Sequence, residues 1–256
     1  MRMKKGIKVL LAGLVILMMN MSTVYAAEEY TDNELYNMAY HYYKENNYEE
    51  YREIQSDIVM TINEHDSGLE ELRLYMDAGM ICEFLDLYYI DRTTGIGVDL
   101  EGNIVDLRKS ILYQAMDLYT DIKFANNTST YKYRNDILDE NGYGMMRIGF
   151  YNIDTYSGME KYLDKTFNIA ITKDLLSEYR NVNDKLYRLA ADRGSDITVI
   201  DWECMEVFET DVERYFKVKI LIDEDYDQTA DTYEICHFIQ CKIDGEWIFT
   251  DFPYFY

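Results

Sequence analysis

The chain has 256 residues, 48% of them apolar and 15% aromatic, and its 48 acidic and 25 basic side chains leave a net charge of −23 at pH 7. A single proline and 13 glycines exclude a fibrous or linker-rich protein, and the apolar content excludes a disordered one. The charge makes nucleic acid and anionic membrane poor partners, because binding to either needs cationic side chains.

Residues 1–26 have the organisation of a cleavable secretory signal peptide. Four basic residues lie within the first eight positions, and an apolar stretch follows from Val9 to Met21. This stretch is shorter than the roughly 20 residues that a membrane span needs. Small residues up to Ala26 predict cleavage after that residue. No cysteine follows the apolar stretch, so we expect a secreted or wall-associated product without a lipid anchor.

Cleavage would also change the charge. It removes four basic residues and no acidic one, which leaves 21 basic and 48 acidic side chains and a net charge of −27. Such a surface favours a basic protein, for example a basic wall enzyme, or metal ions as partners. The alternative is that the charge only keeps a secreted protein soluble.

Residues 27–106 are predicted to form a small module of one helix and an antiparallel sheet. Thr31 and Glu34 have the spacing of a capping box, which predicts a helix over about 32–46. Short apolar runs separated by turn residues predict the strands. The expected strands are 58–62, 72–75, 85–91 and 96–99, with turns at 92–95 and 101–103.

Residues 107–256 are predicted to form a second α+β domain, in which helices precede an antiparallel meander. Asp106 is expected to cap a helix with a buried stripe, 125–130 to form a polar loop, and Thr172 to cap a short helix. Asp244 and Gly245 predict a tight hairpin. The stripe is Ile111, Leu112, Ala115, Leu118, Tyr119 and Ile122; the later helices are 156–166 and 173–180, and the strands are 145–150, 185–189, 202–208, 215–222, 233–243 and 247–251.

The sequence shows no constellation of catalytic residues. His41, His65 and His237 do not have metal-ligand spacing, and no nucleophile elbow or glycine-rich phosphate loop is present. A pair of carboxylates could serve a glycosidase, but 48 acidic residues make such a pair uninformative. We therefore expect a protein without catalytic activity and without a cofactor, and an acid-dependent hydrolase is the weakest alternative.

The four cysteines are Cys82, Cys204, Cys236 and Cys241. Export permits disulfides, and Cys204 could pair with Cys236 or Cys241 if their predicted strands are neighbours. Free buried thiols are the other interpretation, and the sequence leaves the choice open.

One acidic segment follows the pattern of a calcium-binding loop. Carboxylates and a hydroxyl occupy alternate positions from residue 223, and an acidic residue ends the pattern, as calcium coordination requires. Gln228 stands where the loop needs glycine, Ala230 interrupts the pattern, and the flanks are strand-like, all of which argue against a calcium site. The candidate ligands are Asp223, Asp225, Asp227, Thr229, Asp231 and Glu234.

Several segments from Leu107 to the C-terminus occur in the order found in a known family. The segments are 116–119, 154–155, 159–163, 165–167, 172–179, 184–187, 191–195, 201–202, 244–247 and 251–253. In this order the chain resembles the IseA-type inhibitors of peptidoglycan DL-endopeptidases, which Gram-positive bacteria secrete. The hairpin Tyr89–Gly95 is similar to small PepSY-like modules.

The resemblance implies a cystatin-like α+β domain and a protein that binds a cell-wall endopeptidase and blocks its cleft. The partner would be the catalytic domain of that enzyme, and a basic one would suit the acidic chain. We expect the loop of Asp192, Arg193, Gly194 and Ser195 to contact it, because a glycine-containing loop between strands often carries function. A plain structural turn is the alternative for this loop. An extracellular binding module with another protein or wall ligand is the alternative function.

Overall fold

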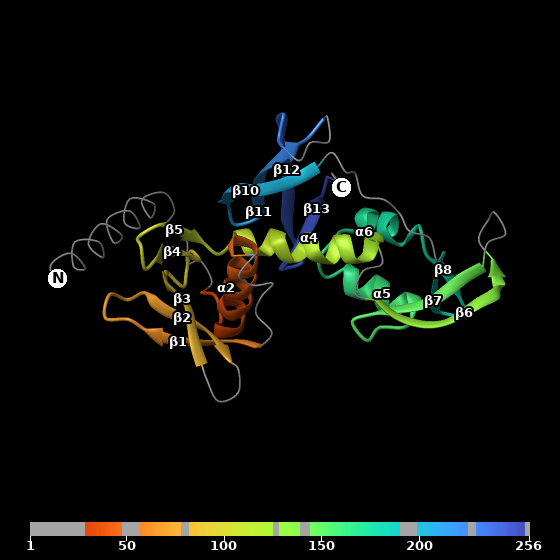
Figure 1. Cartoon of the computed structure of the whole chain (residues 1–256), viewed down its shortest axis with the longest axis horizontal. Coiled ribbons are helices and arrows are strands. Elements are labelled where there is room, and N and C mark those ends of the chain that lie inside the picture. The colour runs from red at the N-terminus through yellow and green to blue at the C-terminus, as the bar shows by residue number, and fades with distance from the viewer. Residues whose placement is uncertain are drawn as a thin grey trace. The chain divides into compact units, whose positions relative to one another are not determined.

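The computed structural model describes residues 29–47, 57–77, 82–124, 128–138, 144–189, 199–224 and 229–253. It is an α+β protein in which helices combine with antiparallel sheets, as the sequence predicts (Figure 1). The chain divides into two compact units, residues 1–114 and 115–256. This division lies inside one helix, a few residues beyond the boundary near residue 106 that the sequence suggests.

In residues 29–106, as far as the structure describes them, one helix packs on a five-stranded antiparallel meander. Helix α2 spans Asp32–Asn46, and its capping box is present: the Thr31 hydroxyl accepts from the Glu34 amide, and the Glu34 carboxylate accepts from the Thr31 amide at 2.7 Å. The strands pair in chain order. They are β1 (Asp57–Glu64), β2 (Glu70–Asp77), β3 (Cys82–Ile90), β4 (Ile96–Asp99) and β5 (Ile104–Asp106).

One face of this sheet and one face of α2 share the core of the unit. Leu35, Ala39, Leu72, Leu74 and Ile90 are fully buried in it. Gly97 allows β4 to approach β3 closely, because a Cβ at this position would lie 1.8 Å from the carbonyl oxygen of Tyr89.

Arg92 joins the start of the N-terminal unit to its sheet. Its guanidinium donates to Glu70 of β2 at 2.8 Å, to Asp32 of α2 at 2.7 Å and to the Tyr30 carbonyl at 2.9 Å. All of these partners are local to the unit, so Arg92 has a structural role.

The C-terminal unit contains two four-stranded antiparallel sheets and short helices. Helix α4 (Lys109–Phe124) enters it from the first unit. One sheet has the order β6-β7-β9-β8, and the other is the meander β10-β11-β12-β13. The remaining elements are β6 (Thr128–Leu138), β7 (Gly144–Phe150), α5 (Tyr156–Leu163), α6 (Ile169–Leu176), β8 (Arg180–Val182), β9 (Lys185–Leu189), β10 (Val199–Glu209), β11 (Glu213–Ile222), β12 (Thr232–Ile243) and β13 (Glu246–Asp251).

Two predicted helix caps are wrong. Asp106 ends β5, and its carboxylate binds the guanidinium and amide of Arg108, so α4 begins only at Lys109. Helix α6 begins four residues earlier than predicted, because the side chain of Asn168 accepts from the amides of Ala170 and Ile171. Thr172 is therefore a buried residue inside α6.

Three strands were not predicted: β5, β8 and β6, of which residues 128–130 were expected to belong to a polar loop. Strand β8 returns into β9 through Asn183 and Asp184, which both have positive φ, the conformation that two-residue hairpins favour. Asp244 and Gly245 also have positive φ and join β12 to β13, which confirms the predicted hairpin.

Candidate functional site

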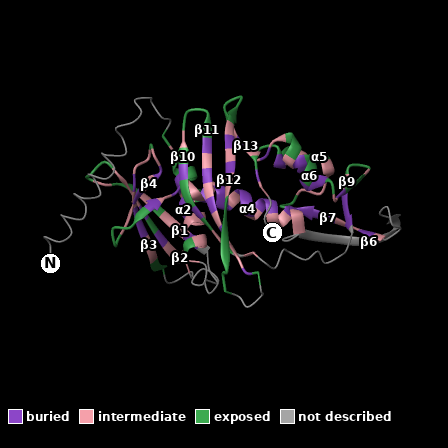
Figure 2. Ribbon diagram, turned by 90° about the horizontal axis from the view of Figure 1, so that it is seen from above, coloured by how far each residue is buried: buried purple, intermediate pink, exposed green. Residues whose placement is uncertain are grey.

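The meander β10–β13 is fixed by a core of aromatic side chains on its inner face. Strand β11 alternates between buried and half-buried residues along most of its length (Figure 2). The buried residues meet rings from other parts of the unit: Phe249 lies 5.7 Å from Phe216, and Phe252 stacks on Tyr119 of α4 at 5.0 Å between ring centres. The ring contacts also include Phe167 and Phe238.

One edge of this sheet is covered. The amide of Phe249 in β13 donates to the Thr166 carbonyl at 2.8 Å, and the Asn168 amide donates to the Phe249 carbonyl at 2.9 Å. The side chain of Asn168 also donates to the Thr250 carbonyl at 3.0 Å. The start of α6 is thus bonded to β13, which makes the sheet a rigid base for side chains on its outer face.

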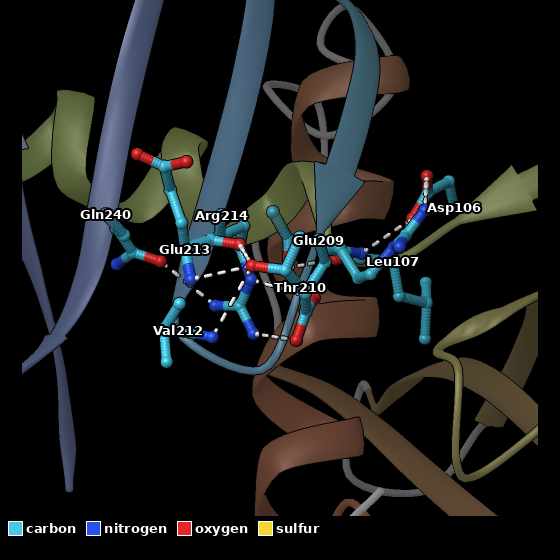
Figure 3. Close-up of polar contacts among 10 residues, drawn as sticks. Asp106, Leu107, Glu209, Thr210, Val212, Glu213, Arg214 and Gln240 are labelled. Carbon is cyan, nitrogen blue, oxygen red and sulfur yellow. Dashed lines mark hydrogen bonds and ion pairs between the residues drawn. The ribbon is translucent and has the colours of Figure 1, made fainter. Parts of the chain in front are cut away.

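A buried arginine joins all four strands of the meander. The guanidinium of Arg214 (β11) donates twice to Glu209 (β10), at 2.9 and 3.0 Å, and once to Gln240 (β12), at 3.0 Å (Figure 3). It also lies 4.5 Å from the ring of Trp247 in β13. The side chain is only 5% exposed, and these contacts compensate the cost of burying its charge.

This arginine lies at the end of the sheet where two hairpin turns meet. The Lys242 amide of β12 donates to the Val212 carbonyl in the β10–β11 turn at 2.8 Å. Near these turns Phe208 is 62% exposed, Val212 65% and Ile243 45%. Large apolar side chains are therefore presented to solvent by a well-held part of the sheet.

The outer face of the meander carries aromatic and basic side chains. The ring of Tyr215 stacks on His237 at 4.7 Å, and the ammonium of Lys219 lies 5.1 Å from the ring of Tyr233. We call this surface the open face. It consists of Phe208, Tyr215, Lys217, Lys219, Tyr233 and His237.

The open face combines basic and acidic groups. In the strand register, Lys217 of β11 lies opposite Glu206 of β10, and Lys219 lies opposite Glu203. Both glutamates are exposed. Exposed aromatic rings among groups of both charges are typical of surfaces that bind other proteins. The groups on the open face are therefore suited to recognising another molecule.

The sequence-predicted sites are only partly described. Asp192, Arg193, Gly194 and Ser195 lie outside the described residues, as do Asp225 and Asp227, so both site hypotheses stay predictions. At the base of the acidic loop, Asp223 is buried, and the Asp231 carboxylate accepts the Glu224 amide at 2.9 Å. Glu234 is exposed on β12. Among the described residues, no group of three or more His, Cys, Asp or Glu side chains is arranged to hold a metal.

The expectation that the strands of Cys204 and Cys236 are neighbours is wrong. Strand β11 separates them, and Val218 stands between the two cysteines in the register. Two strand spacings amount to about 10 Å, whereas a disulfide needs Cα atoms within about 7 Å. No disulfide joins any of the four cysteines, all of which lie within the described residues, and burial raises the pKa of the Cys236 thiol to about 11, with a smaller contribution from Glu234.

No family model, curated protein or solved structure matches this chain. The likeness to IseA-type inhibitors therefore remains a resemblance in the order of short segments. In the part of the chain that the structure describes, no helix is long and apolar enough to cross a membrane.

Sequence reasoning did not single out the open face, although a signal for it was present. The predicted strand 215–222 places Tyr215, Lys217 and Lys219 on one side and Phe216 and Val218 on the other, because side chains alternate along a strand. His237 is half-buried, and only the pairing of β11 with β12 places it against Tyr215.

Proposed function

We propose that this chain is a secreted, non-catalytic protein that binds peptidoglycan DL-endopeptidases and inhibits or regulates them. The observation that carries the proposal is the open face: the exposed aromatic side chains of Phe208 and Tyr233, together with half-buried aromatic and basic side chains, on a sheet held rigidly from its inner side. Rigid surfaces bind with a smaller loss of conformational entropy than mobile ones. The open face would be the surface that contacts the enzyme.

The charge of the chain supports a basic partner. A net charge of −23 accelerates the encounter with a basic protein and slows the encounter with an acidic one. The open face itself carries positive and negative side chains. Contacts there would therefore determine how the partner is oriented more than how fast it is encountered. Association should therefore slow markedly as salt rises, because screening shortens the range of the long-range attraction.

The cystatin-like build is also part of the proposal. Helices α4, α5 and α6 precede a four-stranded antiparallel meander, and aromatic side chains of α4 and of the meander pack together. This order is compatible with the architecture that the resemblance implies. The neighbouring turns at residues 210–212 and 244–245, the first of which carries exposed Val212, would reach into a cleft of the enzyme.

An inhibition assay tests the proposal. The purified chain is added to the DL-endopeptidases of its host during peptidoglycan digestion, and the loss of turbidity is followed. We expect slower digestion, and we expect the double variant Phe208→Ala/Tyr233→Ala to need at least about tenfold more protein for the same effect, as for the loss of a binding hot spot. The control is Ile169→Ala, because Ile169 is 64% exposed on α6, away from the open face.

Two results would contradict the proposal. Undiminished digestion by every host endopeptidase would exclude inhibition, and equal potency of the double variant and the wild type would exclude the open face as the contact. A pull-down from wall extract then identifies the partner. Recovery of another protein or wall ligand in place of a hydrolase would support an extracellular binding module instead.

A further inference from the structure

The N-terminal sheet has a second surface that the proposed function does not use. Its inner face packs on α2, and its outer face carries the rings of His65, Tyr75, Phe84 and Tyr89. We call this surface the aromatic platform. Phe84 is 46% exposed, and the other three side chains are half-buried.

The rings of the aromatic platform form two separate pairs. Tyr75 and Phe84 are paired across β2 and β3 with ring centres 5.9 Å apart, and His65 meets Tyr89 at 5.1 Å. In the register Tyr89 lies opposite Glu71, four residues before Tyr75 on β2. At a rise of about 3.3 Å per residue the pairs are roughly 13 Å apart, a span that several linked sugar rings can cover.

A chain of polar groups connects the two aromatic pairs. The guanidinium of Arg73 binds the Glu71 carboxylate at 2.7 Å. Tyr75 lies two residues beyond Arg73 on the same face of β2, and Tyr89 lies opposite Glu71 in the register. Tyr75 and Glu71 raise the pKa of Arg73, while burial and then Glu71 raise the pKa of Tyr89, so both groups keep their protons at neutral pH. Exposed Thr61 and Asn63 of β1 lie opposite Arg73 and Glu71 in the register.

We propose that the aromatic platform binds a neutral glycan strand. Sugar rings have apolar C–H faces that pack on aromatic rings, and their hydroxyls need donors and acceptors nearby, which the polar chain and the β1 side chains supply. Between the two pairs Arg73 and Glu71 neutralise each other, while Asp77, two residues beyond Tyr75 on the same face, and the chain as a whole repel anionic polymers. This inference does not depend on the contact with an endopeptidase, and it gives the first unit the role of holding the protein on a polysaccharide.

The test is a titration of the full chain with the neutral tetramer of N-acetylglucosamine, followed by tyrosine fluorescence and calorimetry. We expect saturable binding that Phe84→Ala weakens at least about tenfold and Tyr89→Ala also weakens. Ile169→Ala is the control, because Ile169 is an apolar residue that is 64% exposed on α6 of the other unit and belongs to neither surface, and it should bind like wild type. Circular dichroism of each variant confirms that it is folded.

Several outcomes would overturn the inference. The first is absence of binding to the tetramer, and the second is binding that folded Phe84→Ala and Tyr89→Ala variants retain in full. Equal binding to a polyuronate of the same length would show that the neutral character of the platform does not select the ligand. Concentration-dependent dimerisation that Phe84→Ala abolishes would assign the platform to a second copy of the chain. The inhibition assay reports on the open face alone, so the two proposals can fail separately.

Discussion

Two arginines of this protein are buried where neighbouring groups accept their hydrogen bonds. Arg214 has Glu209 and Gln240 as acceptors, and Arg188 is buried among acceptors in the same way. Satisfied groups of this kind cost little to bury, whereas the loss of one partner leaves a charge without compensation. The thiol of Cys236 is a different case, because burial is the main cause that raises its pKa and keeps it neutral.

The four thiols should therefore differ in reactivity. Cys82 is exposed, Cys204 is fully buried, and half-buried Cys236 has its pKa raised to about 11. At pH 8 we expect iodoacetamide to modify Cys82 first and Cys236 much more slowly, because the thiolate is the reacting form. Peptide mass spectrometry of timed samples measures both rates. Equal rates at the two positions in the folded protein would contradict the burial of Cys236.

At the scale of elements, a few long side chains join strands to helices. Arg188 of β9 is 4% exposed and donates to the carbonyls of Ile122 and Lys123, at the C-terminal end of α4, at 3.3 and 2.5 Å. It also donates to the Tyr179 hydroxyl at 3.0 Å and contacts Glu178 at 3.3 Å. A cation at this end of a helix satisfies its last carbonyls and its dipole.

Arg188 should contribute more to the stability of the fold than an arginine on the surface does. We expect Arg188→Ala to lower the free energy of unfolding by about 2–3 kcal/mol, because it removes the side chain that donates to the Lys123 carbonyl and the Tyr179 hydroxyl, while Glu178 keeps its ion pair with Lys123. Arg180→Ala, at an exposed position of the adjoining strand β8, should change it by no more than about 0.5 kcal/mol. Urea denaturation measures both values. Similar, small losses in the two variants would show that Arg188 does not hold α4 to the sheet.

At the scale of the whole molecule, 26 tyrosines make the protein sensitive to alkaline pH. Burial is the main cause that raises the pKa of Tyr42, to about 12, and that of Tyr88, and nearby aspartates add to both shifts. Burial also raises the pKa of Tyr151, together with its hydrogen bond to Asp121. The folded chain thus keeps protons that the unfolded chain releases near pH 10.

The sign of the pH dependence follows from this difference. The stabilising contribution of these tyrosines is complete below about pH 10 and is lost as the pH rises toward their folded pKa values. We expect the free energy of unfolding to fall steadily from pH 9.5 to 11.5 and to fall less steeply in Tyr88→Phe, which has one fewer titrating group. Urea denaturation at each pH, with tyrosine ionisation followed by absorbance, tests this. A flat profile, or an unchanged slope in Tyr88→Phe, would contradict it.

The sequence predicted the helices and turns well where the contacts that fix them join residues close in the chain. The Thr31–Glu34 capping box and the Asp244-Gly245 hairpin are contacts between residues close in the chain, and both are present. The cap of α6 was misplaced because Asn168 competes with Thr172 for this role, and Asn168 also bonds Thr250, far along the chain. Strand β8 was missed because three residues are too few to show a period.

The sequence by itself determined the α+β class, the acidic character and the strands of the C-terminal meander, because alternation, capping and net charge are properties of residues near one another in the chain. Only the tertiary structure decided that Cys204 and Cys236 are separated by β11, that Tyr215 meets His237, and that two aromatic pairs share the outer face of the N-terminal sheet. These facts depend on which strands become neighbours and in which register. Register is selected by the burial of a whole face at once, so no single segment of the sequence contains it.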